Sequence, residues 1–177
     1  VNEFVLLDNF YGDGEVSGDG NSWTMSAQAN DYLEKTWVSS YGGRGGTYDS
    51  EGKRAIASPD DGFFWDYCQR AGVSYRSYGE FVDDKKANIP TLEGHFCPDY
   101  PGFDMGIRDT VRFNLWKKEF DSLVAITQVP RFNSIRFGND HTEGARVGKP
   151  TVFAHVADND LAVGRFVEHL SQSKIWN

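Results

Sequence analysis

The sequence FNSIRFGNDHTEG, residues 132–144, decides which fold this chain is expected to adopt. Its first six residues alternate in the manner of a short β-strand, and Gly138 then ends the alternation. The residues NDHT, at positions 139–142, follow at once. In an open α/β sheet, ligands and catalytic groups gather at the carboxyl ends of the strands, which is where these polar residues would lie.

From these residues alone, two interpretations of Asp140 and His141 stay open. A carboxylate beside an imidazole at a strand end can serve as a pair of metal ligands. Asn and Asp also favour turns, and a single His in a loop more commonly has no special role. Taken by itself the stretch favours a turn. The choice between a turn and a metal site therefore depends on the segments on either side.

Composition limits the function classes. The chain has 177 residues, of which 39% are apolar and 15% aromatic, and this suits one packed domain or a piece of a larger one. The net charge of −8 and the lack of a Lys/Arg block argue against a nucleic-acid partner. The apolar runs are too short for a membrane span. Cys68 and Cys97 have no metal-ligand spacing and could be free or paired.

The first part of the chain predicts a strand, a Gly-rich loop and a helix, in that order. A short apolar run predicts a buried strand at residues 3–9, and a loop follows at 11–20. The helix would begin after Asn21 or Ser22 as its N-cap. Ser17, in the loop, would then face backbone N–H groups that can stabilise a nucleophile or a bound phosphate. A loop serine more commonly bonds only its own loop.

The rest of the chain continues the alternation of helices and strands. A helix that begins near Pro59 and is stopped by Gly72 leads into a strand at residues 73–78. Asp109 is expected to cap the next helix, and Pro150 to open the last one, with Asp158 facing away from the core. For the earlier of these two helices the expected inner face is Phe113, Trp116, Phe120 and Leu123. For the last helix the expected buried side is Val152, Val156, Val163, Phe166, Val167 and Leu170.

Several segments, spread over nearly the whole chain, resemble one known family. They are FVLLDNFY (4–11), GEVS (14–17), YGGRG (41–45), GVSYRSYGE (72–80), NDHT (139–142) and VADNDLAVGR (156–165). Together they resemble the bacterial phosphoesterase family of the alkaline-phosphatase-like superfamily. The resemblance implies an α/β fold, a three-layer sandwich with a mostly parallel central sheet, as a single domain over residues 1–177.

The resemblance also implies an activity, the metal-dependent hydrolysis of a phosphate-ester substrate. Ser17 matches the family's nucleophile, with Thr24 as the second choice, and Asp140 and His141 match its metal-binding loop before the last helix. The implied cofactors are divalent metal ions, with zinc, calcium and manganese as candidates. Two such ions would hold the phosphoryl oxygens and activate Ser17, and water would then cleave the phosphoserine intermediate.

The chain departs from the family pattern at both ends. The family's upstream Glu-Asn-Arg type motif and the paired aspartates after its final helix have no counterpart here, and Asn21 stands where relatives often carry His. We therefore expect an incomplete domain that is inactive alone, because a catalytic metal needs several protein ligands. The alternative is a non-catalytic α/β domain that binds an anion or a partner. The resemblance further implies a periplasmic or secreted location.

Overall fold

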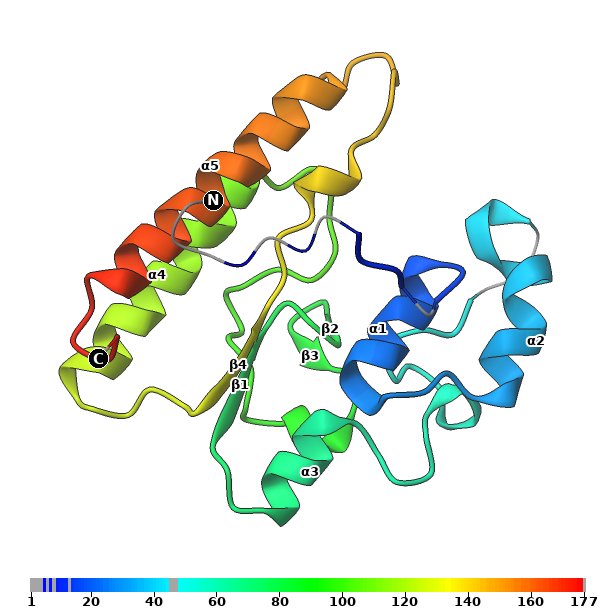
Figure 1. Cartoon of the computed structure of the whole chain (residues 1–177), viewed down its shortest axis with the longest axis horizontal. Coiled ribbons are helices and arrows are strands. Elements are labelled where there is room, and N and C mark those ends of the chain that lie inside the picture. The colour runs from blue at the N-terminus through cyan, green and yellow to red at the C-terminus, as the bar shows by residue number, and fades with distance from the viewer. Residues whose placement is uncertain (1–4, 6, 8, 13, 45–47, 177) are drawn as a thin grey trace. The chain divides into compact units, whose positions relative to one another are not determined.

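The computed structural model describes residues 5, 7, 9–12, 14–44 and 48–176 and has mixed α/β structure (Figure 1). The described residues form five α-helices, one parallel pair of strands and one short antiparallel pair. The predicted α/β class and the parallel pairing are thereby confirmed. The chain divides into two compact units, Val1–Tyr67 and Cys68–Asn177, and each is described by itself.

The first unit contains α1 (Ser17–Ser26) and α2 (Asp31–Ser40), followed by the short 3₁₀ turns η1 (Tyr41–Gly43) and η2 (Ala55–Ala57). The prediction of one helix starting after Asn21 or Ser22 is wrong, because the first helix already begins at Ser17 and a second helix begins after Asn30. Ala27 adopts the left-handed conformation, with φ of 56°, and ends α1. Asn30 then starts α2, because its side chain accepts a hydrogen bond from the backbone N–H of Leu33 at 3.0 Å.

The strand predicted at residues 3–9 falls largely outside the described residues, since 3, 4, 6 and 8 are among those left out. Val5 and Leu7 are described, and neither belongs to a strand. Their side chains are 89% and 66% exposed, so burial is not found at these two positions.

The strands of the second unit follow α3 (Phe64–Arg70), which spans the boundary between the units. β1 (Tyr75–Tyr78) pairs in parallel with β4 (Phe132–Ile135), with Tyr75 opposite Phe132 and Tyr78 opposite Ile135. Both strands lie where the alternation predicted them. β2 (Val82–Asp83) and β3 (Lys86–Ala87) form a small hairpin, and η3 (Pro90–Leu92) follows it.

Two long helices, α4 (Asp109–Ala125) and α5 (Val152–Ser171), lie side by side and run in the same direction (Figure 1). In the sequence, β4 lies between these two helices. Aromatic rings fill the contact. Trp116 stacks on Phe120 with ring centroids 4.6 Å apart, and it meets Phe166 of α5 at 4.4 Å. The inward orientation predicted for Phe113, Trp116 and Phe120 is confirmed.

The buried side of α5 differs in part from the prediction, because Phe166 and Leu170 pack against the core as expected but three of the valines do not. Three valines expected in the core are instead 43%, 45% and 39% exposed: Val152, Val156 and Val163. The residues that α5 buries are His155, Asp158 and Ala162, so the expectation that Asp158 faces away from the core is wrong. A carboxylate can be buried here because α4 and the loop after β4 supply it with hydrogen-bond donors.

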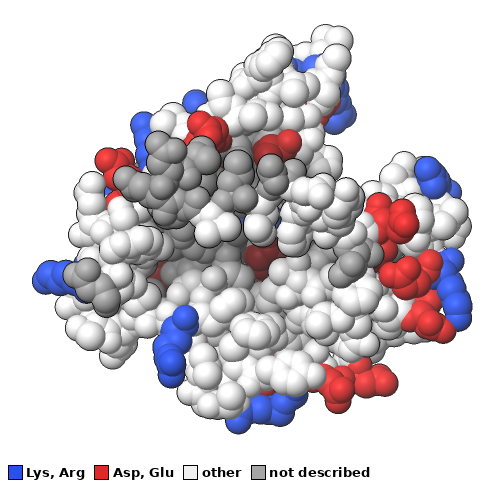
Figure 2. Space-filling view, viewed as in Figure 1, with Lys and Arg blue, Asp and Glu red and all other residues white. Residues whose placement is uncertain are grey.

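Three observations bear on the function classes considered above. Within the described part of the chain, no helix combines the length and the apolarity needed to cross a membrane. On the face seen in Figure 2, described Lys and Arg side chains appear as separate small groups. Cys68 and Cys97 are free thiols, and burial raises the pKa of both.

Candidate functional site

Ser17 is the first residue of α1 rather than part of the loop in which the sequence placed it. The preceding residue, Val16, is extended, and its side chain makes no capping hydrogen bond. The first N–H groups of a helix have no partner within the helix, and they carry its positive partial charge. The exposed Ser17 hydroxyl therefore lies at the end of α1 that favours negative charge.

Two tyrosines surround this serine. The Ser17 Oγ lies 2.6 Å from the Tyr41 hydroxyl, and the Tyr41 ring meets the edge of the Tyr48 ring at 5.3 Å. The Tyr48 hydroxyl in turn donates to the buried carboxylate of Asp19. Burial, and next the hydrogen bond to Asp19, raise the pKa of Tyr48, so that it remains a donor. Tyr41 was not singled out from the sequence, although it opens the YGGRG segment that carried part of the resemblance.

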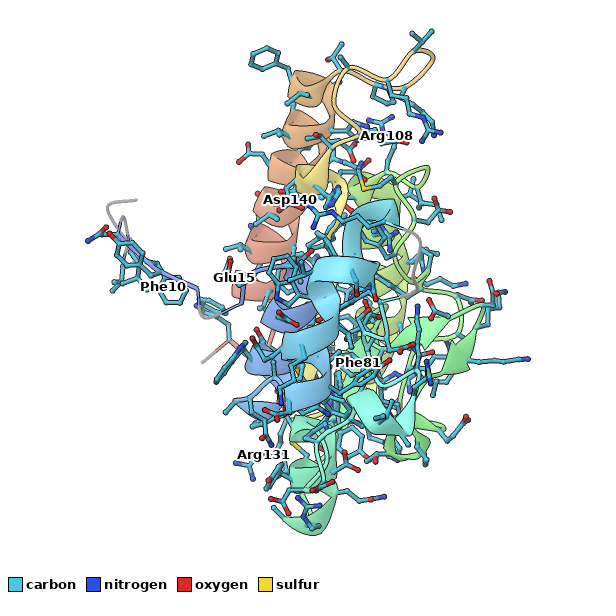
Figure 3. The ribbon with its side chains drawn as sticks, turned by 90° about the vertical axis from the view of Figure 1, so that its right-hand side faces the viewer. Phe10, Glu15, Phe81, Arg108, Arg131 and Asp140 are labelled. Carbon is cyan, nitrogen blue, oxygen red and sulfur yellow. The ribbon has the colours of Figure 1, made fainter. Side chains whose placement is uncertain are left out.

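Ser17 also lines a hollow with a volume of about 420 Å³, which falls in the range of small-molecule sites. The segment before α1 forms one wall, and Figure 3 labels Phe10 and Glu15 on it. Thr24, the second choice for the nucleophile, lines the same hollow, but its hydroxyl donates to the carbonyl oxygen of Gly20 at 2.8 Å. Because that hydroxyl is bonded within α1, Ser17 is the better placed of the two.

Asp140 and His141 lie in the second unit, on the 3₁₀ turn η4 (Asn139–His141). The turn follows β4 directly, as the sequence predicted, and Figure 3 shows Asp140 on it. Both side chains are exposed, whereas Asn139 is buried. Ser17 and this pair therefore belong to different units, and each half of the candidate site is described within its own unit.

Asp109 fixes the base of the turn. The sequence predicted that Asp109 caps its own helix, but its carboxylate instead accepts hydrogen bonds from the backbone N–H groups of Gly138 at 3.0 Å and Asn139 at 2.8 Å. The side chain of Asn159 donates to the same carboxylate at 2.9 Å, and the Arg112 Nε lies 3.3 Å away as an ion-pair contact. Asp109 is fully buried, so this anchor lies away from solvent.

Asp158 provides a second anchor from α5. Its carboxylate accepts hydrogen bonds from the Thr110 hydroxyl at 2.8 Å, the Thr110 backbone N–H at 3.2 Å and the Arg108 guanidinium at 3.0 Å. The Asn139 side chain donates to it at 3.3 Å. Burial opposes the charge, but these donors outweigh it and lower the pKa of Asp158. The turn is thus held by the carboxylates of Asp109 and Asp158, a role that sequence patterns did not indicate for either residue.

The anchored turn leaves Asp140 and His141 available for a ligand. Asp140 makes no hydrogen bond or ion pair with another described residue, which differs from the capping role expected of a simple turn. The His141 Nδ1 lies 3.1 Å from the carbonyl oxygen of Thr142, and its ring meets the edge of Phe103. When Nδ1 donates to a carbonyl, Nε2 keeps the lone pair that a metal-binding histidine needs.

The described residues contain no group of three or more His, Cys, Asp or Glu side chains close enough together to hold a metal ion. Asp140 and His141 are two neighbouring residues of the turn η4, and both are exposed. Comparison with protein-family models, with curated proteins and with solved structures finds no match to this chain.

Proposed function

We propose that this chain carries part of the catalytic centre of a metal-dependent phosphoesterase with an alkaline-phosphatase-like three-layer sandwich. Ser17 is the nucleophile, and Asp140 with His141 binds one divalent ion, for which zinc, calcium and manganese are the candidates. The observation that carries the proposal is the position of Ser17, an exposed hydroxyl on the first turn of α1 in a hollow of ligand size. Helix N-termini favour phosphate groups and developing oxyanions.

Each half would contribute its own chemistry. When bound, the metal would supply positive charge to the phosphoryl oxygens and lower the pKa of a serine hydroxyl near it. Ser17 contributes the attacking oxygen, and the N–H groups of α1 stabilise the charge on the phosphoryl oxygens. Tyr41, 2.6 Å from the Ser17 Oγ, orients the hydroxyl.

The second candidate is a non-catalytic α/β domain that binds an anion or a protein partner. The absence of a three-ligand group among the described residues favours this alternative. The phosphoesterase and an anion-binding domain both expect inorganic phosphate to bind at α1. They differ in whether a metal ion takes part, because only a phosphoesterase joins the anion site and the metal site into one centre.

Thermodynamic coupling between phosphate and metal distinguishes the two candidates. Inorganic phosphate is titrated into the chain with and without Mn²⁺, and the amide signals of residues 17–19 are followed by NMR. We expect Mn²⁺ to tighten phosphate binding by about 5- to 150-fold, and the Asp140→Asn/His141→Gln variant to remove this effect. Phosphate binding that is unchanged by Mn²⁺ would support the non-catalytic anion-binding domain, and no phosphate binding at all would refute both the phosphoesterase and the anion-binding domain.

A further inference from the structure

His155, on the first turns of α5, is buried without a hydrogen bond. The residue is 2% exposed, and neither Nδ1 nor Nε2 has a hydrogen-bond partner among the described residues. Leaving a buried polar group unpaired destabilises a protein, because the group loses its hydrogen bonds to water. Native proteins seldom keep such a group unless an ion, a water molecule or a catalytic role accounts for it.

Glu143 faces this histidine from the segment after η4. Its Oε1 lies 3.3 Å from Arg146 Nη1 and 3.3 Å from Lys149 Nζ. Its Oε2 is buried, has no hydrogen-bond partner in the described part of the chain and lies 3.9 Å from the His155 Nε2. Unpaired nitrogen and oxygen atoms of His155 and Glu143 therefore face each other between the segment after η4 and α5.

The 3.9 Å separation indicates what belongs between Glu143 and His155. It is too long for a direct hydrogen bond, which needs about 2.7–3.2 Å. A zinc-like ion binds imidazole nitrogen at about 2.0–2.1 Å and carboxylate oxygen at about 2.0–2.2 Å, so one ion can contact both atoms. An anion is disfavoured because the Glu143 carboxylate would repel it.

We propose that Glu143 Oε2 and His155 Nε2 bind one divalent transition-metal ion that fastens residues 142–150 to α5. An imidazole nitrogen with a carboxylate oxygen suits zinc, cobalt or manganese. Water completes the coordination. This site is buried, is distinct from the exposed pair Asp140 and His141, and does not depend on phosphoesterase activity.

Two cations limit the affinity of this site and supply a test of its charge. Arg146 and Lys149 both contact the other Glu143 oxygen, and their side chains are 71% and 37% exposed. Solvent screens them, but each still opposes a bound cation. Lys149→Gln should therefore tighten cation binding, whereas it would weaken the binding of an anion.

The experiment is a titration of the 177-residue chain with Co²⁺, followed by its visible absorption and by calorimetry. We expect His155→Gln and Glu143→Gln each to weaken Co²⁺ binding at least about tenfold. Lys149→Gln should tighten it about two- to fivefold. The matched control is His169→Gln, because His169 lies on the same helix but pairs with Asp121, and it should leave the affinity unchanged.

Three results would overturn the proposal. The first is Co²⁺ binding in His155→Gln or Glu143→Gln that equals wild type, and the second is weaker binding in Lys149→Gln. The third is no Co²⁺ binding in wild type, which would mean that water alone bridges the gap. The Asp140→Asn/His141→Gln variant should still bind Co²⁺ at the buried site. If this variant loses Co²⁺ binding, the ion belongs to the exposed pair instead. If His155→Gln fails to fold by circular dichroism, Glu143→Gln decides.

Discussion

Asp109→Asn should release the turn that carries Asp140 and His141. The wild-type carboxylate accepts three hydrogen bonds, from Gly138, Asn139 and Asn159, and it lies beside the buried guanidinium of Arg112. An asparagine keeps one acceptor oxygen and turns an NH₂ group toward N–H donors. It also removes the negative charge next to Arg112, which is itself only 1% exposed.

The size of the effect follows from these contacts. Each buried donor left without an acceptor costs about 1–3 kcal/mol, and removing one partner of a buried ion pair costs about 3–5 kcal/mol. Because Asn retains part of the hydrogen bonding, we expect a total loss of about 3–5 kcal/mol. A domain of this size is stable by about 5–15 kcal/mol, so the variant should fold but open far more readily.

Amide hydrogen exchange at Gly138 and Asn139 measures this opening directly. A loss of about 3–5 kcal/mol corresponds to exchange about 150- to 4,000-fold faster. Asp160→Asn is the matched control, since Asp160 is an exposed aspartate on α5, and it should change stability by no more than about 0.5 kcal/mol. Exchange in Asp109→Asn within about threefold of wild type would show that Asp109 does not hold the turn.

Three further predictions test other parts of the chain. Gly18→Ala should destabilise the first unit by about 1–3 kcal/mol in urea unfolding, because its Cβ would lie 2.2 Å from Tyr48. A Cβ at Gly20 would have no neighbour within 4 Å, so Gly20→Ala should be neutral or stabilising by about 0.5–1 kcal/mol. Equal effects of Gly18→Ala and Gly20→Ala would contradict the close packing of Tyr48 on Gly18. The lowered pKa of Asp158 adds stability at neutral pH that is lost as the pH falls through that pKa. The difference in unfolding free energy between wild type and Asp158→Asn should therefore shrink below about pH 4, and a constant difference would argue against an ionised anchor. Finally, the 177-residue chain with Mn²⁺ should hydrolyse p-nitrophenyl phosphate no faster than buffer. Turnover that survives a second purification and disappears in Ser17→Ala would contradict this prediction.

The tyrosine pair beside Ser17 gives the first unit its own local order. Tyr48 is held by Asp19 and packs against Gly18 of α1, while Tyr41 reaches the Ser17 hydroxyl. These contacts join α1 to the segment after α2 across more than twenty residues of sequence. Ser17→Ala removes one exposed hydrogen bond of this set, so we expect the unit to remain folded.

Local chemistry was sufficient to predict several elements. The alternation at residues 132–137 predicted β4, and Thr151 begins α5 because its side chain accepts a hydrogen bond from the N–H of Ala154. Both signals depend on neighbours within a few residues, which is why a sequence pattern can report them. The aromatic face of α4 was predicted for the same reason, since large apolar residues recur at helical spacing.

Only the tertiary structure decided which side of α5 is buried and what holds the turn. Hydrophobic periodicity placed Val152 and Val156 inside and Asp158 outside, and the structure reverses this. A buried carboxylate is stable only where donors surround it, and those of Asp158 come from Thr110, Arg108 and Asn139, 19 to 50 residues away in the sequence. No local pattern contains that information, because the partners meet only after β4 has brought the turn beside α4 and α5.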